Sequence, residues 1–539
     1  MLRRPLTFVL WMIATWVVTS GSILSASNFD PPSPPSAHTH EGRIVGMTVS
    51  GVNEFLGIPY AAPPVGARRW RPPIAHAHFS SPFTATSFGS ACIQPGPLGS
   101  EDCLFLNVYT PASAGPSSGL PVMVYIHGGA LVKGDASQFD PAWLVAQGVI
   151  VVTINYRLGY FGFFAESAID AEHHLLGNYG LMDQQFALQW VQNNIAGFGG
   201  NPAEVTIFGE SAGGESVYSN VASPTATGLF RGAISESGAD IFQSLFTLII
   251  PLAAGETTGT QVVPAGSAVA ASLGCTAHHV AACLRAVSAD DIAAIEPNTV
   301  HPFVDGAVLT QTPAAAFADG DFNQVPMISG SNHDEYRYFI AEAYDLVGMP
   351  LTDAVYPAAV AQTVRQSATS TLVESLVDTD YPLANYPPPP GYSVSAPLAL
   401  GALGTDFMFA CSARNANLSL AAFVPVYAYE FNDENSPPPA ALASDTLSFP
   451  LGDCHTVELQ YLFVMGTVFM PNEQTLSDTM VGYWTQFVKT LNPNSSGAPA
   501  WPEYAGGGSI QSLIAPTPAT ETDASFDTDH QCSSLWNTL

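Results

Sequence analysis

Five short apolar runs, most of them ending near a glycine, an asparagine or a charged residue, dominate the hydrophobic pattern of the chain. They cover residues 121–128, 149–156, 204–210, 325–332 and 423–431. Each is rich in Val, Ile, Tyr or Phe, which is typical of buried β-strands. Residues 179–199 carry apolar positions at helical spacing, and Gly197 is expected to end that helix. Strands that alternate with helices predict an α/β fold with a mainly parallel sheet and helices on both faces.

Two long stretches, residues 216–322 and 335–422, contain few strand-like runs. We interpret them as helical and loop insertions that cap the sheet. The chain has 539 residues, and neither an internal repeat nor a linker interrupts it after residue 40. The sequence therefore predicts one large catalytic domain over residues 41–539, although length alone would allow several domains.

The N-terminus has the pattern of a secretory signal peptide. Arg3 and Arg4 precede an apolar stretch that is short for a membrane span, and small residues follow up to Ala26. We predict a signal peptide over residues 1–26 and a Pro-rich spacer over residues 27–40. An uncleaved N-terminal anchor is the alternative. No later run of eighteen apolar residues occurs, so no stable span is expected after cleavage. The protein is expected to be secreted, periplasmic or held at the cell surface.

Charge excludes some classes of partner. Acidic residues number 45 and basic residues 14, which gives a formal net charge of −31, and Lys133 and Lys489 are the two lysines. Nucleic acids and anionic membranes bind proteins through lysine and arginine, so neither is an expected partner.

Seven cysteines fit an oxidising compartment. Cys92 lies close to Cys103 in the sequence, and Cys275 lies close to Cys283, so either pair could close a small loop. The pairing of the remaining three, Cys411, Cys454 and Cys532, stays open.

The stretch TIFGESAGGES, residues 206–216, places Ser211 between Gly209 and Gly213, directly after a strand-like run. The two glycines leave room for a strand-to-helix turn that is too tight for side chains. This is the nucleophile elbow, in which a serine is exposed at the end of a strand. A glycine-rich turn with a solvated serine is the alternative.

A serine nucleophile needs a base, an acid and an oxyanion hole. On α/β-hydrolase folds these follow the order serine, acid, histidine, and only His455 and His530 follow the candidate acid named below. His530 lies near the C-terminus, where we expect fraying, so His455 is the better base. The Gly-rich loop in YIHGGAL, residues 125–131, and the N–H of Ala212 are the expected oxyanion donors.

Several longer segments resemble the type-B carboxylesterase family, which includes cholinesterases, carboxylesterases and fungal lipases. The matching segments are residues 55–73, 100–111, 124–131, 151–164, 177–217, 301–306, 330–339 and 455–463. The resemblance implies an α/β-hydrolase fold and a serine esterase activity without a metal or cofactor. It also implies a role for each matching residue: Ser211 as nucleophile, Glu335 as acid, His455 as base, and Gly129, Ala130 and Ala212 as oxyanion donors.

The resemblance extends to structural residues. It implies disulfides Cys92–Cys103 and Cys275–Cys283, ion pairs Arg69–Glu101 and Arg157–Asp183, and a place for Glu210 beside the site. Two positions depart from the family pattern. Ala130 replaces the commoner glycine, which matters little if only its N–H is used. Tyr336 replaces the usual glycine after the acid, which puts the local turn in question.

We therefore predict a secreted carboxylic ester hydrolase that acts on small-molecule esters. Two rivals are a cholinesterase-like adhesion protein, which would lack the nucleophile or base, and a true lipase. Only ten residues, 93–102, separate Cys92 from Cys103, too few for a broad lid. These ten residues include no aromatic side chain for a cation–π site. Neutral short- to medium-chain or aryl esters are therefore expected to be better substrates than choline esters.

Overall fold

The computed structural model describes residues 33–96, 99–170, 172, 177–238, 259–276, 279–295, 300–367, 369–443 and 446–538. The predicted signal peptide lies outside the described residues. The chain from Pro35 onward forms one compact unit. Strand β1 (Ser36–Thr39) pairs with β2 (Gly42–Val45), and Ala37 is buried opposite Ile44. Part of the predicted spacer is therefore a β-strand that buries an apolar side chain.

The central sheet has eleven strands in the order β14-β13-β12-β11-β10-β9-β7-β8-β6-β4-β3. Their bounds are Met47–Val49 (β3), Val52–Pro59 (β4), Phe105–Pro111 (β6), Leu120–Ile126 (β7), Ile150–Ile154 (β8), Gly200–Glu210 (β9), Gly232–Glu236 (β10), Met327–Asn332 (β11), Val426–Phe431 (β12), Ser509–Leu513 (β13) and Ala519–Thr522 (β14). From β8 to β13 all neighbours are parallel, whereas the strands at both edges are antiparallel. A smaller sheet joins β1, β2 and β5 (Phe83–Thr84).

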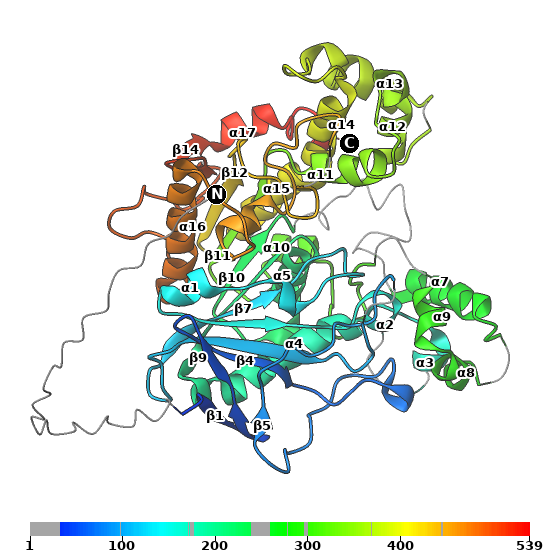
Figure 1. Cartoon of the computed structure of the whole chain (residues 1–539). Helices are drawn as coiled ribbons and strands as arrows, with labels where there is room; N and C mark the ends of the chain where they lie inside the picture. Colours follow the sequence, from blue (N-terminus) through cyan, green and yellow to red (C-terminus); the bar gives the residue numbers. More distant parts are fainter. Residues whose placement is uncertain are drawn as a thin grey trace, which may run out of the picture. The chain divides into compact units, whose positions relative to one another are not determined.

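Both faces of the sheet are covered. In β7, Val122, Val124 and Ile126 enter one hydrophobic core, and Met123 and Tyr125 enter the other, because successive side chains of a strand point to opposite faces. Helices α4 (Tyr179–Asn194) and α5 (Ala212–Ala222) cover the first face. Helices α1 (Ala142–Ala146) and α16 (Pro471–Thr490) cover the second (Figure 1). The predicted α/β fold with a mostly parallel sheet is confirmed.

Each of the five predicted strands is present. The predicted helix over residues 179–199 continues from α4 into a short 3-10 turn, Ile195–Phe198, and ends at Gly199, whose φ is 92°. Gly199 rather than Gly197 is thus the left-handed residue that stops the helix. Strand β10 lies inside a predicted insertion. Its sequence, GAISE, has too few apolar residues to be recognised, yet every residue is buried between β9 and β11.

Apart from β10, the described residues of the insertions are helix and loop, as expected, and Figure 1 shows α7–α9 and α11–α14 as two separate groups. The remaining helices have the following bounds: Gly159–Gly162 (α2), Ser167–Asp170 (α3), Gly259–Ser272 (α7), Val280–Ala286 (α8), Ala289–Ala293 (α9), Pro313–Asp319 (α10), Tyr336–Ile340 (α11), Tyr356–Thr363 (α12), Thr371–Ser375 (α13), Ala396–Thr405 (α14), Cys411–Leu420 (α15) and Asp523–Asp529 (α17).

A π-helical turn, Asp406–Ala410 (η10), joins α14 to α15. The combined helix, Ala396–Leu420, is long and apolar enough to cross a membrane, but 89% of its apolar window is buried inside the protein. It is a core helix of the folded unit.

Three disulfides are present. Cys92–Cys103 and Cys275–Cys283 are the pairs that the resemblance implies. Cys411–Cys532 joins residues 121 positions apart and ties the C-terminal segment to α15. Cys454 is a buried free cysteine. Sequence spacing suggests short loops but cannot identify a pair that tertiary packing brings together.

A buried ion pair joins the segment after β8 to α4. Arg157 Nε lies 2.7 Å from Asp183 Oδ2, and Arg157 Nη2 lies 2.8 Å from Oδ1. The side chains are 4% and 0% exposed. Arg69 likewise contacts Glu101 through two nitrogens, at 2.6 and 2.7 Å. A bidentate pair in this setting is specific in geometry, and losing one partner leaves a buried charge uncompensated.

We therefore expect Asp183→Asn to lower the free energy of unfolding by about 3–5 kcal/mol. Arg71→Gln is the control, because the Arg71 side chain is 48% exposed in its pair with Glu172 and its loss should cost less than about 1 kcal/mol. Urea unfolding monitored by tryptophan fluorescence measures both. Equal losses in the two variants would contradict the structural role of the buried pair.

Candidate active site

Ser211 lies at the turn from β9 to α5 in a left-handed conformation, with φ 57° and ψ −126°. Such a backbone is strained for a residue with a side chain and persists only where its surroundings hold it. The Ser211 N–H donates to the carbonyl of Glu236 at 2.8 Å, which fixes the turn to β10. A Cβ on Gly209 or Gly213 would approach the Ile126 carbonyl to 2.5 or 2.0 Å. The tight turn therefore needs both glycines, as the sequence predicts.

The loop after β7 contacts this turn. A Cβ on Gly128 would lie 3.0 Å from Cβ of Ser211. Gly129, Ala130 and Leu131 all have positive φ, at 106°, 55° and 57°. Among the described residues, no backbone carbonyl accepts the N–H of Gly129, Ala130 or Ala212, and the first N–H groups of a helix have no partner within it. Three N–H groups near Ser211 are thus available to an oxyanion.

The structure shows the backbone at both departures from the family pattern. Ala130 adopts a left-handed backbone that glycine would adopt freely. Alanine in place of the family's glycine therefore costs roughly 1–3 kcal/mol of strain. Tyr336 is not among the described residues with positive φ. Its N–H donates to Thr405 Oγ1 at 3.1 Å, and it begins α11. The turn after Glu335 therefore does not require a glycine.

Glu335 and His455 come from loops 120 residues apart and meet in the interior. His455 Nδ1 lies 2.5 Å from Glu335 Oε2, and the two residues are 3% and 0% exposed. The other oxygen of Glu335 accepts the N–H of Asn332 at 2.8 Å. The backbone N–H of His455 donates to the Glu335 carbonyl at 3.3 Å. Side-chain and backbone contacts together fix the carboxylate at the Nδ1 edge of the imidazole.

The second imidazole nitrogen reaches the residue before the elbow. His455 Nε2 lies 3.2 Å from Glu210 Oε1, and Glu210 directly precedes Ser211. The Ser211 hydroxyl makes no direct hydrogen bond with the described residues. In the structure Glu335 thus contacts one nitrogen of His455. The other nitrogen contacts Glu210, the residue before Ser211, and not Ser211 itself.

Buried carboxyl groups surround the imidazole. Burial alone would lower the pKa of His455, but Glu210 and Glu335 outweigh burial and raise it to about 10. Burial raises the pKa of Glu210 to about 7 and that of Glu236 to about 8. Burial also raises the pKa of Glu458, which lies three residues after His455 in the sequence. Carboxyl groups with raised pKa values retain protons near neutrality, which limits the negative charge that this pocket concentrates.

Sequence reasoning missed Glu236, Glu458 and Asn332. Asn332 Nδ2 donates to Glu458 Oε2 at 2.5 Å and to the Cys454 carbonyl at 3.0 Å, so it joins the acid turn to the base loop. Trp484 Nε1 donates to Glu236 Oε1 at 2.9 Å. The position of Glu458, three residues after His455, is the only local signal that could have identified one of these groups.

Three aromatic rings contact His455. The ring centroids of Phe339, Phe409 and Tyr338 lie 5.0, 5.2 and 6.1 Å from that of the imidazole. Phe339 and Tyr338 lie on α11, one turn after Glu335, and Phe409 lies in η10. These rings pack around the imidazole and exclude water from it.

Contrary to the expectation of fraying, His530 is buried, with 3% of its surface exposed. Both of its ring nitrogens contact carboxylates, Asp406 and Glu430, each at 2.6 Å. The Cys411–Cys532 disulfide and the packing of α17 hold this segment in place. His530 is therefore an ordered residue of the core, and its nitrogens are not available to Ser211.

Among the described residues, two groups of side chains carry atoms of the kind that bind metals. Ligand atoms of His333, Glu430 and His530 lie within 4.8 Å of one another, as do those of His333, Asp334 and Asp453. In the first group, His530 has no nitrogen lone pair free, because carboxylates accept from both nitrogens. In the second, Arg337 Nη1 lies 2.6 Å from Asp334 and brings positive charge to the site. Neither donor set favours a divalent cation.

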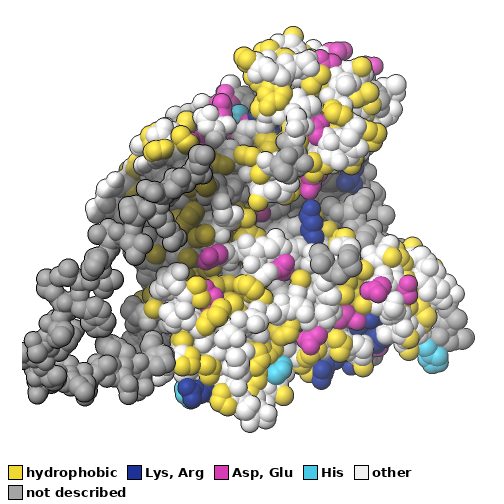
Figure 2. Space-filling view, in the orientation of Figure 1, with side chains coloured by type: hydrophobic (Ala, Val, Ile, Leu, Met, Phe, Trp, Pro, Cys, Tyr) yellow, Lys and Arg dark blue, Asp and Glu magenta, His cyan; other side chains and the backbone are white. Residues whose placement is uncertain are grey.

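The few basic side chains of the chain are dispersed on the surface that Figure 2 shows. On the described part of the face drawn in Figure 2, basic side chains occur as scattered single positions rather than as a continuous patch. The described part of this face therefore offers no surface of the kind that binds a phosphate backbone.

Known proteins are similar to this chain in sequence and in fold. Residues 33–531 match the Carboxylesterase family. The chain is 36% identical to "Pyrethroid hydrolase Ces2e" of Rattus norvegicus over 512 residues, which cover 87% of this chain and 84% of that protein. It is also 36% identical to "Cocaine esterase" of Homo sapiens over 510 residues, which cover 87% and 86%.

Among solved structures, a "thermophylic PNB esterase" superimposes with a TM-score of 0.75 at 30% identity, covering 93% of this chain and all of that one. A "PNB esterase" superimposes with a TM-score of 0.74 at 31% identity, covering 92% of this chain. Sequence and fold agree over nearly the whole described chain, so the protein belongs to the carboxylesterase family and is a carboxylic ester hydrolase.

Proposed function

We propose that Ser211, His455 and Glu335 form the catalytic triad of this esterase and act through an acyl-enzyme intermediate. The observation that supports this most is the 2.5 Å contact between His455 Nδ1 and Glu335 Oε2. Glu335 fixes the imidazole tautomer and stabilises the imidazolium that forms, while the opposite nitrogen faces the elbow.

In the first step, Ser211 Oγ attacks the ester carbonyl and Nε2 of His455 takes its proton. Substrate binding has to bring the hydroxyl and Nε2 into direct contact, as is common where free sites have long catalytic hydrogen bonds. Nε2 can accept only when the imidazole is neutral, so His455, whose pKa the neighbouring carboxylates raise, must first lose its extra proton. His455 then returns the proton to the leaving alcohol, and water hydrolyses the acyl-enzyme.

The N–H groups of Gly129, Ala130 and Ala212 stabilise the oxyanion of each tetrahedral intermediate. Their support is geometric: the strained loop 129–131 and the N-terminus of α5 both present unpaired N–H groups beside Ser211. Donors fixed before the reaction cost no reorganisation when charge develops, and each is worth about 3–4 kcal/mol of barrier.

The substrates that fit are neutral esters with short to medium acyl chains or aryl groups. The loop between Cys92 and Cys103 carries no aromatic residue. We also propose that the protein is exported and that residues 41–539 form the catalytic domain. The three disulfides support an oxidising compartment.

The main test is Ser211→Ala. We expect kcat/KM for p-nitrophenyl butyrate to fall by at least about 10⁴-fold, because members of a triad act as a unit. Ser117→Ala, at an exposed position, is the control and should retain wild-type activity. Labelling by a fluorophosphonate probe should be lost in Ser211→Ala alone. Near-wild-type turnover in this variant would rule out the mechanism.

A second pair of variants tests the choice of acid. Glu335→Gln should lower kcat by about 10³–10⁴-fold, because it removes the charge that stabilises the imidazolium. Asp334→Asn should have a much smaller effect, because Asp334 contacts Arg337 at 2.6 Å rather than His455. Steady-state kinetics of both variants measures this difference. A larger loss in Asp334→Asn would reverse the assignment.

Substrate preference is tested with butyrylthiocholine and an uncharged butyryl thioester of similar size. We expect a higher kcat/KM for the uncharged thioester. A preference for the choline ester would instead assign cation binding to an aromatic residue outside the Cys92–Cys103 loop. Tyr338, beside His455, would then be the first candidate.

A further inference from the structure

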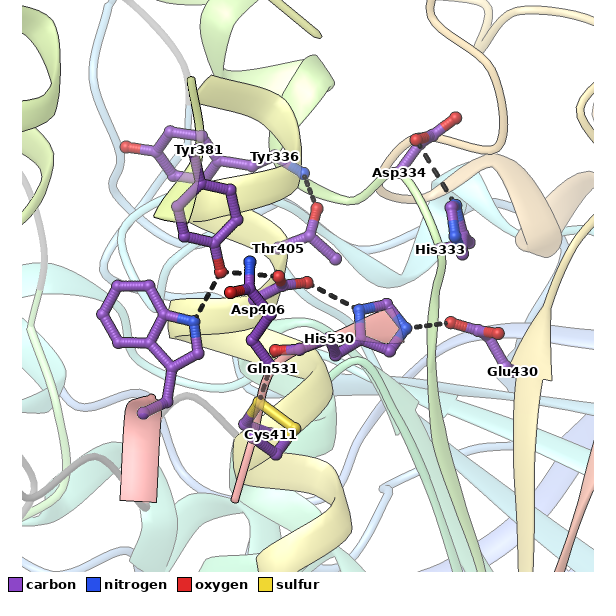
Figure 3. Close-up of polar contacts among 12 residues, drawn as sticks. His333, Asp334, Tyr336, Tyr381, Thr405, Asp406, Cys411, Glu430, His530 and Gln531 are labelled. Carbon is purple, nitrogen blue, oxygen red and sulfur yellow. Dashed lines mark hydrogen bonds and ion pairs between the residues drawn. A yellow bond between two sulfur atoms is a disulfide. The ribbon is translucent and has the colours of Figure 1, made fainter. Parts of the chain in front are cut away.

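His530 joins two parts of the fold through both nitrogens of its ring. Its Nδ1 lies 2.6 Å from Asp406 Oδ1 and its Nε2 lies 2.6 Å from Glu430 Oε1 (Figure 3). Two carboxylate acceptors require two N–H donors, so the ring carries both protons and a positive charge. Burial opposes this charge, but Glu430 and Asp406 outweigh it and raise the pKa of His530 well above its ordinary value.

The remaining polar atoms of this cluster are also satisfied. Asp406 Oδ2 accepts from the Tyr381 hydroxyl at 2.7 Å, and that hydroxyl accepts from Trp536 Nε1 at 2.7 Å. Glu430 Oε2 accepts from Asn432 Nδ2 at 2.8 Å. A buried network whose members all have partners is rigid and specifies one arrangement.

The two carboxylates belong to the two elements that hold the acid turn. Asp406 follows Thr405, whose Oγ1 accepts the N–H of Tyr336 at 3.1 Å. Glu430 precedes Phe431, whose carbonyl accepts the N–H of His333 at 3.1 Å. His333 and Tyr336 are the first and last residues of the four-residue turn that contains Glu335. Figure 3 shows the Thr405 contact beside the Asp406–His530–Glu430 bridge.

We propose that His530 is a positioning residue for Glu335: it bridges the α14–η10 junction and β12, and thereby fixes the turn that presents the carboxylate to His455. This role rests on the proposed catalytic triad. The C-terminal segment, which the Cys411–Cys532 disulfide fastens to α15, thus contributes to the geometry of the active site without touching the substrate.

Other groups that face His530 are consistent with this role. The His333 ring lies 5.5 Å from it and the Phe526 ring 4.4 Å, between centroids. Glu521 on β14 borders Glu430. Burial, together with the Glu430 carboxylate, raises the pKa of Glu521 to about 8, so Glu521 keeps its proton near neutrality. The charged partners of the imidazolium are therefore Asp406 and Glu430.

The test compares His530→Gln with Asn537→Ala. Glutamine is neutral and cannot donate to both carboxylates in the same geometry. We expect its kcat to fall between about tenfold and a hundredfold, since a displacement near 1 Å has that effect, with KM within about twofold of wild type. Asn537→Ala also loosens the C-terminal segment, by removing its hydrogen bonds to Asn415 at 2.8 and 3.2 Å, and should leave kcat unchanged.

A double-mutant cycle shows whether His530 acts through Glu335. The variant with both His530→Gln and Glu335→Gln should be no slower than Glu335→Gln alone, whereas independent effects would multiply. If His530→Gln does not fold, Asp406→Asn replaces it in the same comparison. Multiplying effects, or an equal loss of kcat in Asn537→Ala, would overturn the positioning role.

The outcome separates this inference from the triad itself. If Ser211→Ala is inactive while His530→Gln keeps wild-type kcat, only the positioning role fails. If Ser211→Ala remains active, the proposed triad fails first.

Discussion

The left-handed backbone of Ser211 is the constraint on which the rest of the site depends. A serine keeps φ near 57° only if the strand before it and the helix after it are held firmly. Strand β9 lies between β7 and β10 in the middle of the sheet, and every residue of α5 is buried. The close approach of Gly209 and Gly213 to the Ile126 carbonyl connects the turn to β7. Strain at one residue is thus supported by two strands and a helix.

Buried charge is the second constraint. Glu210, Glu236, Glu335 and Glu458 have almost no exposed surface, and the imidazole of His455 lies among them. Several carboxylates cannot all stay ionised in a small buried volume, so burial raises the pKa of three of them and keeps them partly protonated. Two of these three, Glu236 and Glu458, each accept one hydrogen bond, from Trp484 and Asn332 respectively. The electrostatics of the imidazole therefore belong to the whole group and not to one acid.

The C-terminal segment also contains a buried histidine among carboxyl groups. There a histidine lies between two carboxylates, and a tyrosine and a tryptophan complete the chain of hydrogen bonds. This network and the network around His455 are connected by the short turn from His333 to Tyr336. Packing near the end of the chain can thus affect a catalytic loop that is two hundred residues earlier in the sequence.

The sequence by itself determined the parts of this protein that depend on local chemistry. Strand-like runs, the helix over residues 179–199 and the two glycines around Ser211 follow from propensity and close approach, which neighbouring residues encode. The resemblance then supplied Glu335, which local chemistry could not distinguish from Asp334. Tertiary structure alone decided which cysteine pairs with Cys411, that GAISE is a central strand, and that His530 is a buried cation rather than part of a loose end. These features depend on contacts between residues far apart in the chain, and a single sequence carries no local signal for such contacts.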